Sequence, residues 1–112
     1  MDTTTSNVSY IQSWIEFEEL INSPSNKLVV VDFTAKWCGP CKHISPVLDQ
    51  MASSNTYVSN HVMFVKVDVD DAQEISRRCQ IQSMPTFQFY KKGRLVQKFS
   101  GADVAKLKSV LS

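Results

Sequence analysis

The order of hydrophobic and polar residues along the chain predicts a sheet of short strands. The run KLVVVDF, residues 27–33, is apolar on both alternating faces, which is typical of a strand covered by helices on both sides of a parallel sheet. The run VMFVKVDV, residues 62–69, is similarly rich in strand-forming residues. Past Pro85, the segments TFQFY and RLVQKF flank the polar link KKG and predict an antiparallel hairpin. With residues 8–11 as a brief edge strand, five strands are expected.

Apolar residues at helical spacing predict four helices between and after these strands. The first ends near Pro24, and Pro46 lies inside the second, where it removes one backbone donor and predicts a kink. Residues 53–60 are polar and are expected to form a connector. A residue that favours a helix start precedes or opens each helix. In chain order these are the N-cap Ser13, the first-turn proline Pro40, the cap Asp70 or Asp71, and the break at Gly101.

The predicted order of elements, βαβαβαββα, alternates strands with helices until the final hairpin. Such an order indicates an α/β fold of three layers (α/β/α), in which a central mixed five-stranded sheet is flanked by four helices. A chain of 112 residues suits one domain, because a domain of this size buries roughly two thirds of its unfolded surface. We therefore expect one domain over residues 8–112, preceded by a short polar, mobile tail over residues 1–7.

Charge and composition exclude several kinds of partner. Twelve basic and eleven acidic residues give a formal charge of +1, and no window gathers enough Lys or Arg to bind phosphates. Nucleic acid and acidic membrane surfaces are therefore not expected partners. No segment approaches the roughly 18 apolar residues of a membrane span. The start, MDTTTSNV, lacks the features of a secretory signal, which predicts a reducing intracellular compartment.

The chemistry expected in such a compartment centres on Cys38 and Cys41, two of the three cysteines. A close cysteine pair in the cytosol is more often catalytic or metal-binding than structural. Cys38 falls just ahead of a predicted helix, where unpaired N–H groups and the helix dipole stabilise an anion, whereas Cys41 falls one turn inside. Because a thiolate attacks a disulfide, we assign Cys38 as the nucleophile and Cys41 as the resolving thiol, which releases the target from a mixed disulfide.

A structural zinc site is the rival interpretation, because two cysteines at this spacing supply half of a tetrahedral site. The other candidate ligands are poorly placed: Cys79 and His61 lie on different predicted elements, and His43 follows Cys41 by only two residues. The Gly and Pro between the cysteines and the strand before them favour redox chemistry, so no metal is expected. Cys79, which has no close partner in the sequence, is interpreted as a partly buried helix residue.

Three further residues carry open alternatives. Asp32 is an acid inside an apolar strand: if it is buried, desolvation raises its pKa and lets it serve as base for Cys41, and otherwise it faces water at the strand end. Lys66 is expected on the neighbouring strand, where it modulates Asp32 or, as the simpler interpretation, is solvated. Pro85 opens a strand and is either an ordinary strand-start proline or one that follows a cis peptide bond.

The motif WCGPC after the VVVDF strand, joined to MPTFQFY, KKG and FSGA, resembles the thioredoxin family, and in particular its small cytosolic eukaryotic members. The resemblance extends from about Val8 to Leu111 and implies the thioredoxin fold. It also implies that Cys38 is the nucleophile and Cys41 the resolving cysteine, in agreement with the electrostatic assignment.

Further roles follow from the same resemblance. It implies that Gly39 and Pro40 set the redox potential of the pair. It makes Asp32 the buried acid that deprotonates the resolving cysteine, with Lys66 as its neighbour. It makes Pro85 a cis-proline that faces the dithiol, so that the resemblance selects one alternative for Asp32 and for Pro85.

The resemblance also implies a substrate groove and shows two departures from the family pattern. The backbone of Met84 would pair with an extended substrate segment like an added strand, and Trp37 would flank the groove. Thr34 stands where bacterial members often carry tryptophan. Ser83 stands where some animal members have a regulatory cysteine, so regulation through a thiol at that place is not expected.

The function implied is that of a cytoplasmic protein-disulfide reductase, an enzyme and electron carrier that supports cell redox homeostasis. No cofactor is expected to be bound, because electrons come from NADPH through a separate thioredoxin reductase. The expected substrates are disulfide-containing proteins such as peroxiredoxins, and we expect a monomer. The alternative is a non-catalytic binding module that uses the same fold to hold a partner.

Overall fold

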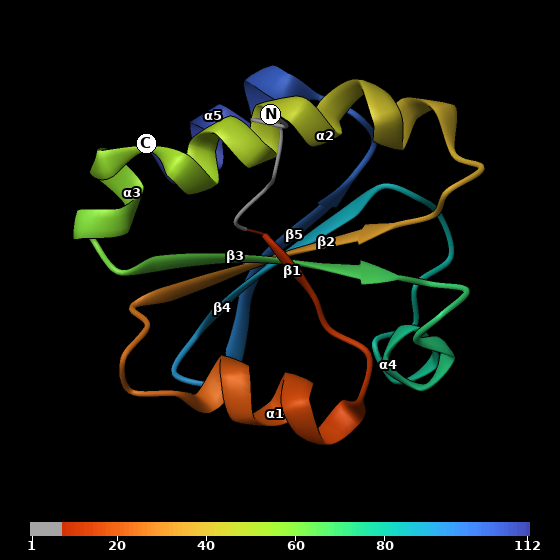
Figure 1. Ribbon diagram of the computed structural model, residues 1–112, viewed down its shortest axis with the longest axis horizontal. Coiled ribbons are helices and arrows are strands. Elements are labelled where there is room, and N and C mark those ends of the chain that lie inside the picture. Colours follow the sequence, from red (N-terminus) through yellow and green to blue (C-terminus); the bar gives the residue numbers. More distant parts are fainter. Residues whose placement is uncertain (1–7) are drawn as a thin grey trace, which may run out of the picture.

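Strand β2 forms the centre of the sheet in the computed structural model, which describes residues 8–112 (Figure 1). The strands lie in the order β1-β3-β2-β4-β5. β3 is parallel to β1 and β2, whereas β4 is antiparallel to β2 and β5. The sheet is therefore mixed, as the sequence predicts. The strands are β1 (Ser9–Tyr10), β2 (Leu28–Thr34), β3 (Val62–Asp68), β4 (Thr86–Lys91) and β5 (Arg94–Ser100).

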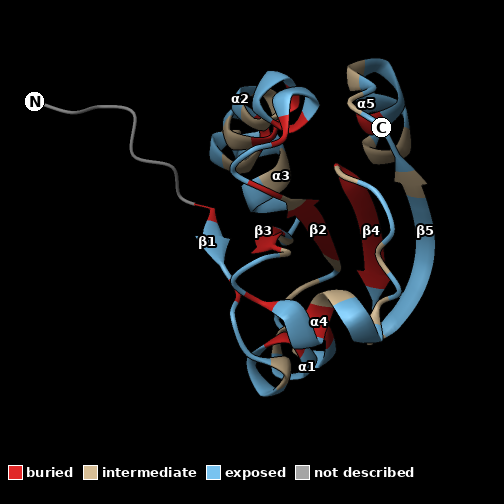
Figure 2. Cartoon of the chain, turned by 90° about the vertical axis from the view of Figure 1, so that its right-hand side faces the viewer, coloured by how far each residue is buried: buried red, intermediate tan, exposed pale blue. Residues whose placement is uncertain are grey.

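Helices cover both faces of this sheet and give three layers (Figure 1). α1 and α4 lie on one face, and α2, α3 and α5 lie on the other. The exposed edge strands β1 and β5 enclose the buried strands β2, β3 and β4 (Figure 2). The helices are α1 (Trp14–Asn22), α2 (Gly39–Ser53), α3 (Asn55–Ser59), α4 (Gln73–Arg78) and α5 (Val104–Leu111).

The core consists of two apolar clusters, one on each side of the sheet. Val31 and Phe33 of β2 belong to the cluster beneath α1 and α4, where Phe17 meets the ring of Tyr90 edge to face at 5.7 Å. Val30 belongs to the cluster beneath α2 and α5. Successive residues of β2 point to opposite faces, so a run that is apolar at almost every position is what a strand between two helix layers requires.

The presence of helix α3 shows that one part of the predicted fold is wrong. The sequence predicts four flanking helices and a connector without secondary structure over residues 53–60, whereas the described residues form five helices. The hydroxyl of Ser54 caps α3 by accepting the N–H of Thr56 at 3.3 Å. The ring of Tyr57 packs edge to face on Phe64 at 5.7 Å, which fixes the helix against the sheet. A helix of five residues is too short to show a helical period in the sequence, so its stability comes from this packing.

The start of α4 also differs from the prediction. Its N-cap is Ala72, which makes no side-chain capping bond, and neither Asp70 nor Asp71 caps the helix. Instead, the Asp68 carboxylate accepts the N–H groups of Asp70 at 2.9 Å and of Asp71 at 3.2 Å. An aspartate that binds the backbone a few residues on forms a local turn that competes with helix capping.

Other predicted boundaries are confirmed. Ser13 caps α1 by accepting the N–H of Glu16 at 3.1 Å. The hairpin turns at Lys92 and Gly93, both with positive φ angles of 52° and 79°, as a two-residue turn between twisted strands requires. The predicted tail over residues 1–7 lies outside the described residues.

Truncation of Leu107, which is fully buried between α5 and the sheet, tests the packing of this layer. We expect Leu107→Ala to lower the free energy of unfolding by about 2–5 kcal/mol, because it removes apolar contacts and leaves a cavity. Leu95 on β5 is exposed, so Leu95→Ala is the matched control and should change stability by less than about 1 kcal/mol. Urea unfolding of both variants measures the difference, and equal losses would contradict the packing.

Candidate active site

Cys38 and Cys41 lie where β2 leads into α2, and they form a disulfide. Cys38 is the N-cap of α2, and its Sγ accepts the backbone N–H of Cys41 at 3.1 Å. Cys38 is 4% exposed and Cys41 is 2% exposed, and both pack with Ala35. The predicted positions, one cysteine ahead of the helix and one a turn inside, are confirmed. The sulfur of Cys38 thus lies at the positive end of the helix dipole.

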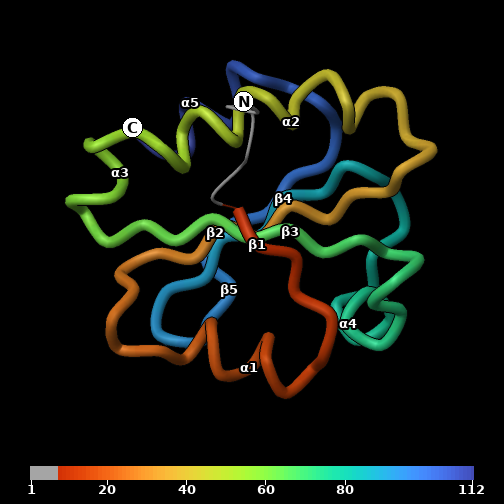
Figure 3. The backbone as a smooth tube through the Cα atoms, in the orientation of Figure 1, coloured from red at the N-terminus to blue at the C-terminus, as the bar shows by residue number. Residues whose placement is uncertain are grey.

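The loop before β4 lies against this pair. The peptide bond between Met84 and Pro85 is cis, and Pro85 is buried directly ahead of β4. Sγ of Cys38 lies 3.7 Å from the carbonyl oxygen of Met84. The cis-proline that the resemblance implies is confirmed, and the ordinary strand-start interpretation is wrong. The connections after β2, after β3 and before β4 all meet at this end of the sheet (Figure 3).

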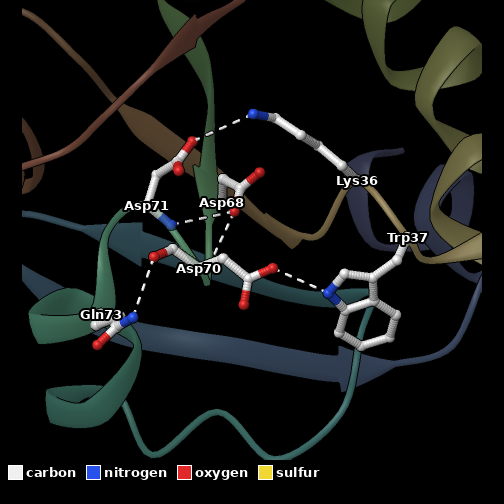
Figure 4. Close-up of polar contacts among 6 residues, drawn as sticks. All are labelled: Lys36, Trp37, Asp68, Asp70, Asp71 and Gln73. Atoms are coloured by element: carbon white, nitrogen blue, oxygen red, sulfur yellow. Dashed lines mark hydrogen bonds and ion pairs between the residues drawn. The ribbon is translucent and has the colours of Figure 1, made fainter.

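Trp37 is 66% exposed beside the disulfide, and a hydrogen bond fixes its ring. Its Nε1–H donates to the carboxylate of Asp70 at 2.9 Å (Figure 4). The turn that holds Asp70 is organised by Asp68, and Lys36 pairs with Asp71 at 3.7 Å across the same gap. Sequence reasoning assigned Asp70 only a capping role. The sequence does contain a signal that Asp70 lies near Trp37. Asp70 follows β3, which is parallel to β2, and parallel strands end at the same edge of the sheet.

Asp32 is buried, at 1% exposure, and its Oδ1 has no hydrogen-bond partner among the described residues. Burial raises the pKa of Asp32 from its ordinary value of 3.8 to about 7, against the opposing effect of the Lys66 ammonium; the Asp49 carboxylate adds to the rise. The interpretation of Asp32 as a water-facing residue is therefore wrong. A carboxyl group with this pKa holds a proton below neutral pH and releases it just above.

Lys66 is also buried, at 5% exposure, so the interpretation of a solvated lysine is wrong. It lies opposite Asp32 in the register of β2 and β3. Its Nζ pairs with the Asp49 carboxylate at 3.0 Å and donates to Ser45 Oγ at 2.6 Å. A charge removed from water requires such partners, and both come from α2. Sequence reasoning missed Ser45 and Asp49, although they follow Cys41 at intervals of four residues and so share its helix face.

A pocket of about 310 Å³ opens beside the resolving cysteine. Its lining includes Cys41 and Ser45 of α2, Tyr10 of β1 and Asp68 of β3. The ring of Tyr10 lies 5.8 Å from Nζ of Lys66. The pocket therefore brings solvent close to both the Cys41 side of the disulfide and the buried charges.

The remaining predicted residues lie as follows. Gly39 and Pro40 are exposed in the first turn of α2, and a Cβ on Gly39 would meet no atom within 4 Å, so space alone does not require glycine there. Thr34 ends β2 beside the pocket of about 310 Å³. The backbone carbonyl of Ser83 accepts the hydroxyl of Thr86 at 2.7 Å.

The ligands considered for zinc stay away from the pair. His43 is exposed on α2, and His61 is exposed just before β3. Cys79 follows the last residue of α4 as its C-cap, half-buried, with Sγ 4.0 Å from the hydroxyl of Tyr90. Within residues 8–112, no three His, Cys, Asp or Glu side chains gather into a metal-binding group.

Fold and site together define a small three-layer α/β protein with a redox-active cysteine pair at a helix N-terminus, facing a cis-proline. The family model of thioredoxin matches residues 9–112. Sheep thioredoxin is 46% identical over 94% of this chain and 96% of its own length. The chain belongs to the thioredoxin family, and it is a thiol–disulfide oxidoreductase.

Solved structures agree with this assignment. Plasmodium falciparum thioredoxin has a TM-score of 0.83 and 41% identity, over 93% of this chain and 96% of that one. A chain from a study of thiol resolution in the yeast mitochondrial 1-Cys peroxiredoxin, through the glutathione and thioredoxin systems, has a TM-score of 0.84. It is 35% identical over 95% of this chain and 96% of that one. In residues 8–112, no helix has the length and apolar character of a membrane span.

The raised pKa of Asp32 predicts how stability depends on pH. Below pH 3.8 the group is protonated in both the folded and the unfolded protein; between pH 3.8 and about 7 only the unfolded chain ionises. Stability attributable to Asp32 therefore falls as pH rises through this window, by up to about 4 kcal/mol. We expect Asp32→Asn to remove this fall. Urea unfolding of the oxidised protein at a series of pH values measures it, and parallel curves for the two proteins would contradict the burial cost.

Proposed function

We propose that this protein is a general protein-disulfide reductase in which Cys38 attacks the target and Cys41 resolves the mixed disulfide. The observation that carries the proposal is the N–H of Cys41 directed at Sγ of Cys38 from the first turn of α2. A hydrogen bond and the helix dipole both favour the thiolate, which is the attacking species. Cys41, one turn inside the helix, receives no comparable contact from the described residues.

The reaction runs in two exchanges with the protein in its dithiol form. The Cys38 thiolate forms a bond with one target sulfur and breaks the target disulfide, which releases the other sulfur as a thiolate that takes up a proton. Cys41 then loses its proton and attacks Sγ of Cys38. This second step releases the target sulfur and leaves the Cys38–Cys41 disulfide, so two electrons pass to the target.

Asp32 is proposed as the base for the second step. Its pKa of about 7 lets the carboxylate accept the proton of Cys41 at neutral pH. Asp32 lies two residues after Val30 on β2 and therefore on the same face, the one that α2 covers, and Cys41 lies on α2 itself. The pocket of about 310 Å³ beside Cys41 gives water access for proton exchange. Lys66 modulates this base as its neighbour across β2 and β3.

The target is proposed to bind across Met84, Pro85 and Trp37. The Met84 carbonyl lies 3.7 Å from Sγ of Cys38, so a target strand that pairs with this backbone would place its disulfide at the nucleophile. The exposed ring of Trp37, held by Asp70, flanks this position. The redox potential is proposed to depend on Gly39 and Pro40 between the cysteines.

The proposed cycle is completed by a separate thioredoxin reductase, which returns electrons from NADPH to the disulfide. The monomer then needs no bound cofactor of its own. Peroxiredoxins are proposed among its substrates, a class supported by the yeast study in which a similar chain occurs. Such a cycle would contribute to electron transport and redox homeostasis in the cytoplasm.

Single cysteine variants test the two assigned roles. Cys41→Ser should accumulate a mixed disulfide with a protein target, because the first attack proceeds and the second step has no thiol. Cys38→Ser should form none and should lose insulin-disulfide reduction. Cys79→Ser is the matched control and should keep the wild-type rate, because Cys79 lies outside the disulfide pair.

Non-reducing mass spectrometry identifies the trapped species. Full insulin reduction by Cys38→Ser would overturn the mechanism. Retention of biological function after serine replaces both Cys38 and Cys41 would instead favour the non-catalytic binding module.

A further inference from the structure

A chain of charged groups crosses the interface between α2 and the sheet. Asp32 lies on β2, Lys66 lies opposite it on β3, and Asp49 lies on α2. The Lys66 ammonium contacts Asp49 at 3.0 Å and Ser45 at 2.6 Å. Oδ1 of Asp32 accepts no hydrogen bond from any described residue. The ammonium is therefore held on the helix side, although a buried carboxyl group lies beside its backbone.

We propose that Asp49 is a positioning residue for the redox reaction: it holds the Lys66 ammonium against α2 and thereby limits how strongly that ammonium stabilises the Asp32 carboxylate. The inference rests on the proposed role of Asp32 as the base for Cys41. In this role Asp49 acts through its contact with Lys66, in addition to the direct repulsion by which its carboxylate raises the pKa of Asp32.

The carboxyl groups of Asp49 and Asp32 differ in how far they are exposed to water. The side chain of Asp49 is about one third exposed, whereas Asp32 is buried. Water therefore reaches the Asp49 carboxylate, which also pairs with the Lys66 ammonium at 3.0 Å. Asp32 lacks this solvation, so its ionisation responds to the nearby charges: the Lys66 ammonium favours it, and the Asp49 carboxylate opposes it.

Among the residues that the structure describes, few other charged or titratable groups lie around Asp32 and Lys66. Tyr10 faces Lys66 from β1, with its ring 5.8 Å from Nζ. Asp68 follows Lys66 by two residues on the same face of β3 and is engaged by the backbone of Asp70 and Asp71. Cys41 faces the region from α2, and Phe87, opposite Asp32 on β4, is uncharged.

Lys36 and Lys42 also line the pocket of about 310 Å³, and both are exposed. Water screens exposed charges of this kind more strongly than buried ones. None of these groups replaces Asp49 as the ionic partner of Lys66 in the described structure.

Asp49→Asn tests the proposal through the pKa of Asp32. Removal of the Asp49 charge releases Lys66 toward Asp32 and also removes a repelling carboxylate, and both effects favour ionised Asp32. We expect the pKa of Asp32 to fall by roughly half a unit or more. Carbon-13 NMR titration of the Asp32 carboxyl group in the oxidised protein measures this value directly.

Two variants serve as controls. Asp49→Glu keeps the charge and should keep the wild-type titration. Glu74→Gln on α4 makes the same change of net charge in an ion pair, that of Glu74 with Arg78 at 3.1 Å, but on the other face of the sheet. It should leave Asp32 unchanged.

The Lys66→Met background separates positioning from a direct effect of charge. There, Asp49→Asn should shift Asp32 by less than half as much as in the wild type, because no ammonium remains to be released. An equal shift in both backgrounds would overturn the positioning role, as would no shift in Asp49→Asn alone.

The titration needs no turnover, so it is independent of the proposed mechanism. The proposed mechanism is tested by a separate experiment. If an Asp32→Asn variant resolves the mixed disulfide at the wild-type rate, Asp32 is not the base. The NMR result for Asp49 would stand in that case.

Discussion

The hydrogen bond from the Cys41 N–H to Sγ of Cys38 is the contact around which the site is arranged. It forms because β2 is buried on both faces, so that its end is fixed in the sheet. α2 begins a few residues after that end, with Cys38 as its N-cap. The first free N–H groups of a helix seek an acceptor, and here the acceptor is a sulfur. The same geometry makes the two cysteines unequal, which is what a two-step exchange requires.

A second consequence of this arrangement is the buried charge behind the dithiol. α2 packs its apolar residues on the sheet, but Ser45 and Asp49 on that helix meet Lys66. Within residues 8–112, one oxygen of the buried Asp32 carboxyl group has no hydrogen-bond partner. A buried acid of this kind costs stability, and such costs are found where a shifted pKa serves the chemistry. The apolar clusters on both faces of the sheet offset the cost.

Much of the fold is predictable from the sequence, because the three central strands β2, β3 and β4 are largely apolar runs and most of the helices carry caps or a clear apolar face. α3 is not, since five residues show no period and a tertiary contact of Tyr57 holds them. The cysteine roles follow from their place at a helix start. The partners of Lys66 do not, because they depend jointly on the strand register and on the rotation of α2. The local pattern of residues along the chain shows neither the register of the strands nor the rotation of the helix.

The helix N-terminus is expected to make Cys38 the more acidic of the two thiols. Site-specific NMR titration of both cysteines in the reduced protein tests it most directly. We predict that Cys38 ionises below the ordinary cysteine pKa of about 8.5 and that Cys41 ionises at a higher pH than Cys38. An equal or lower pKa for Cys41 would contradict it.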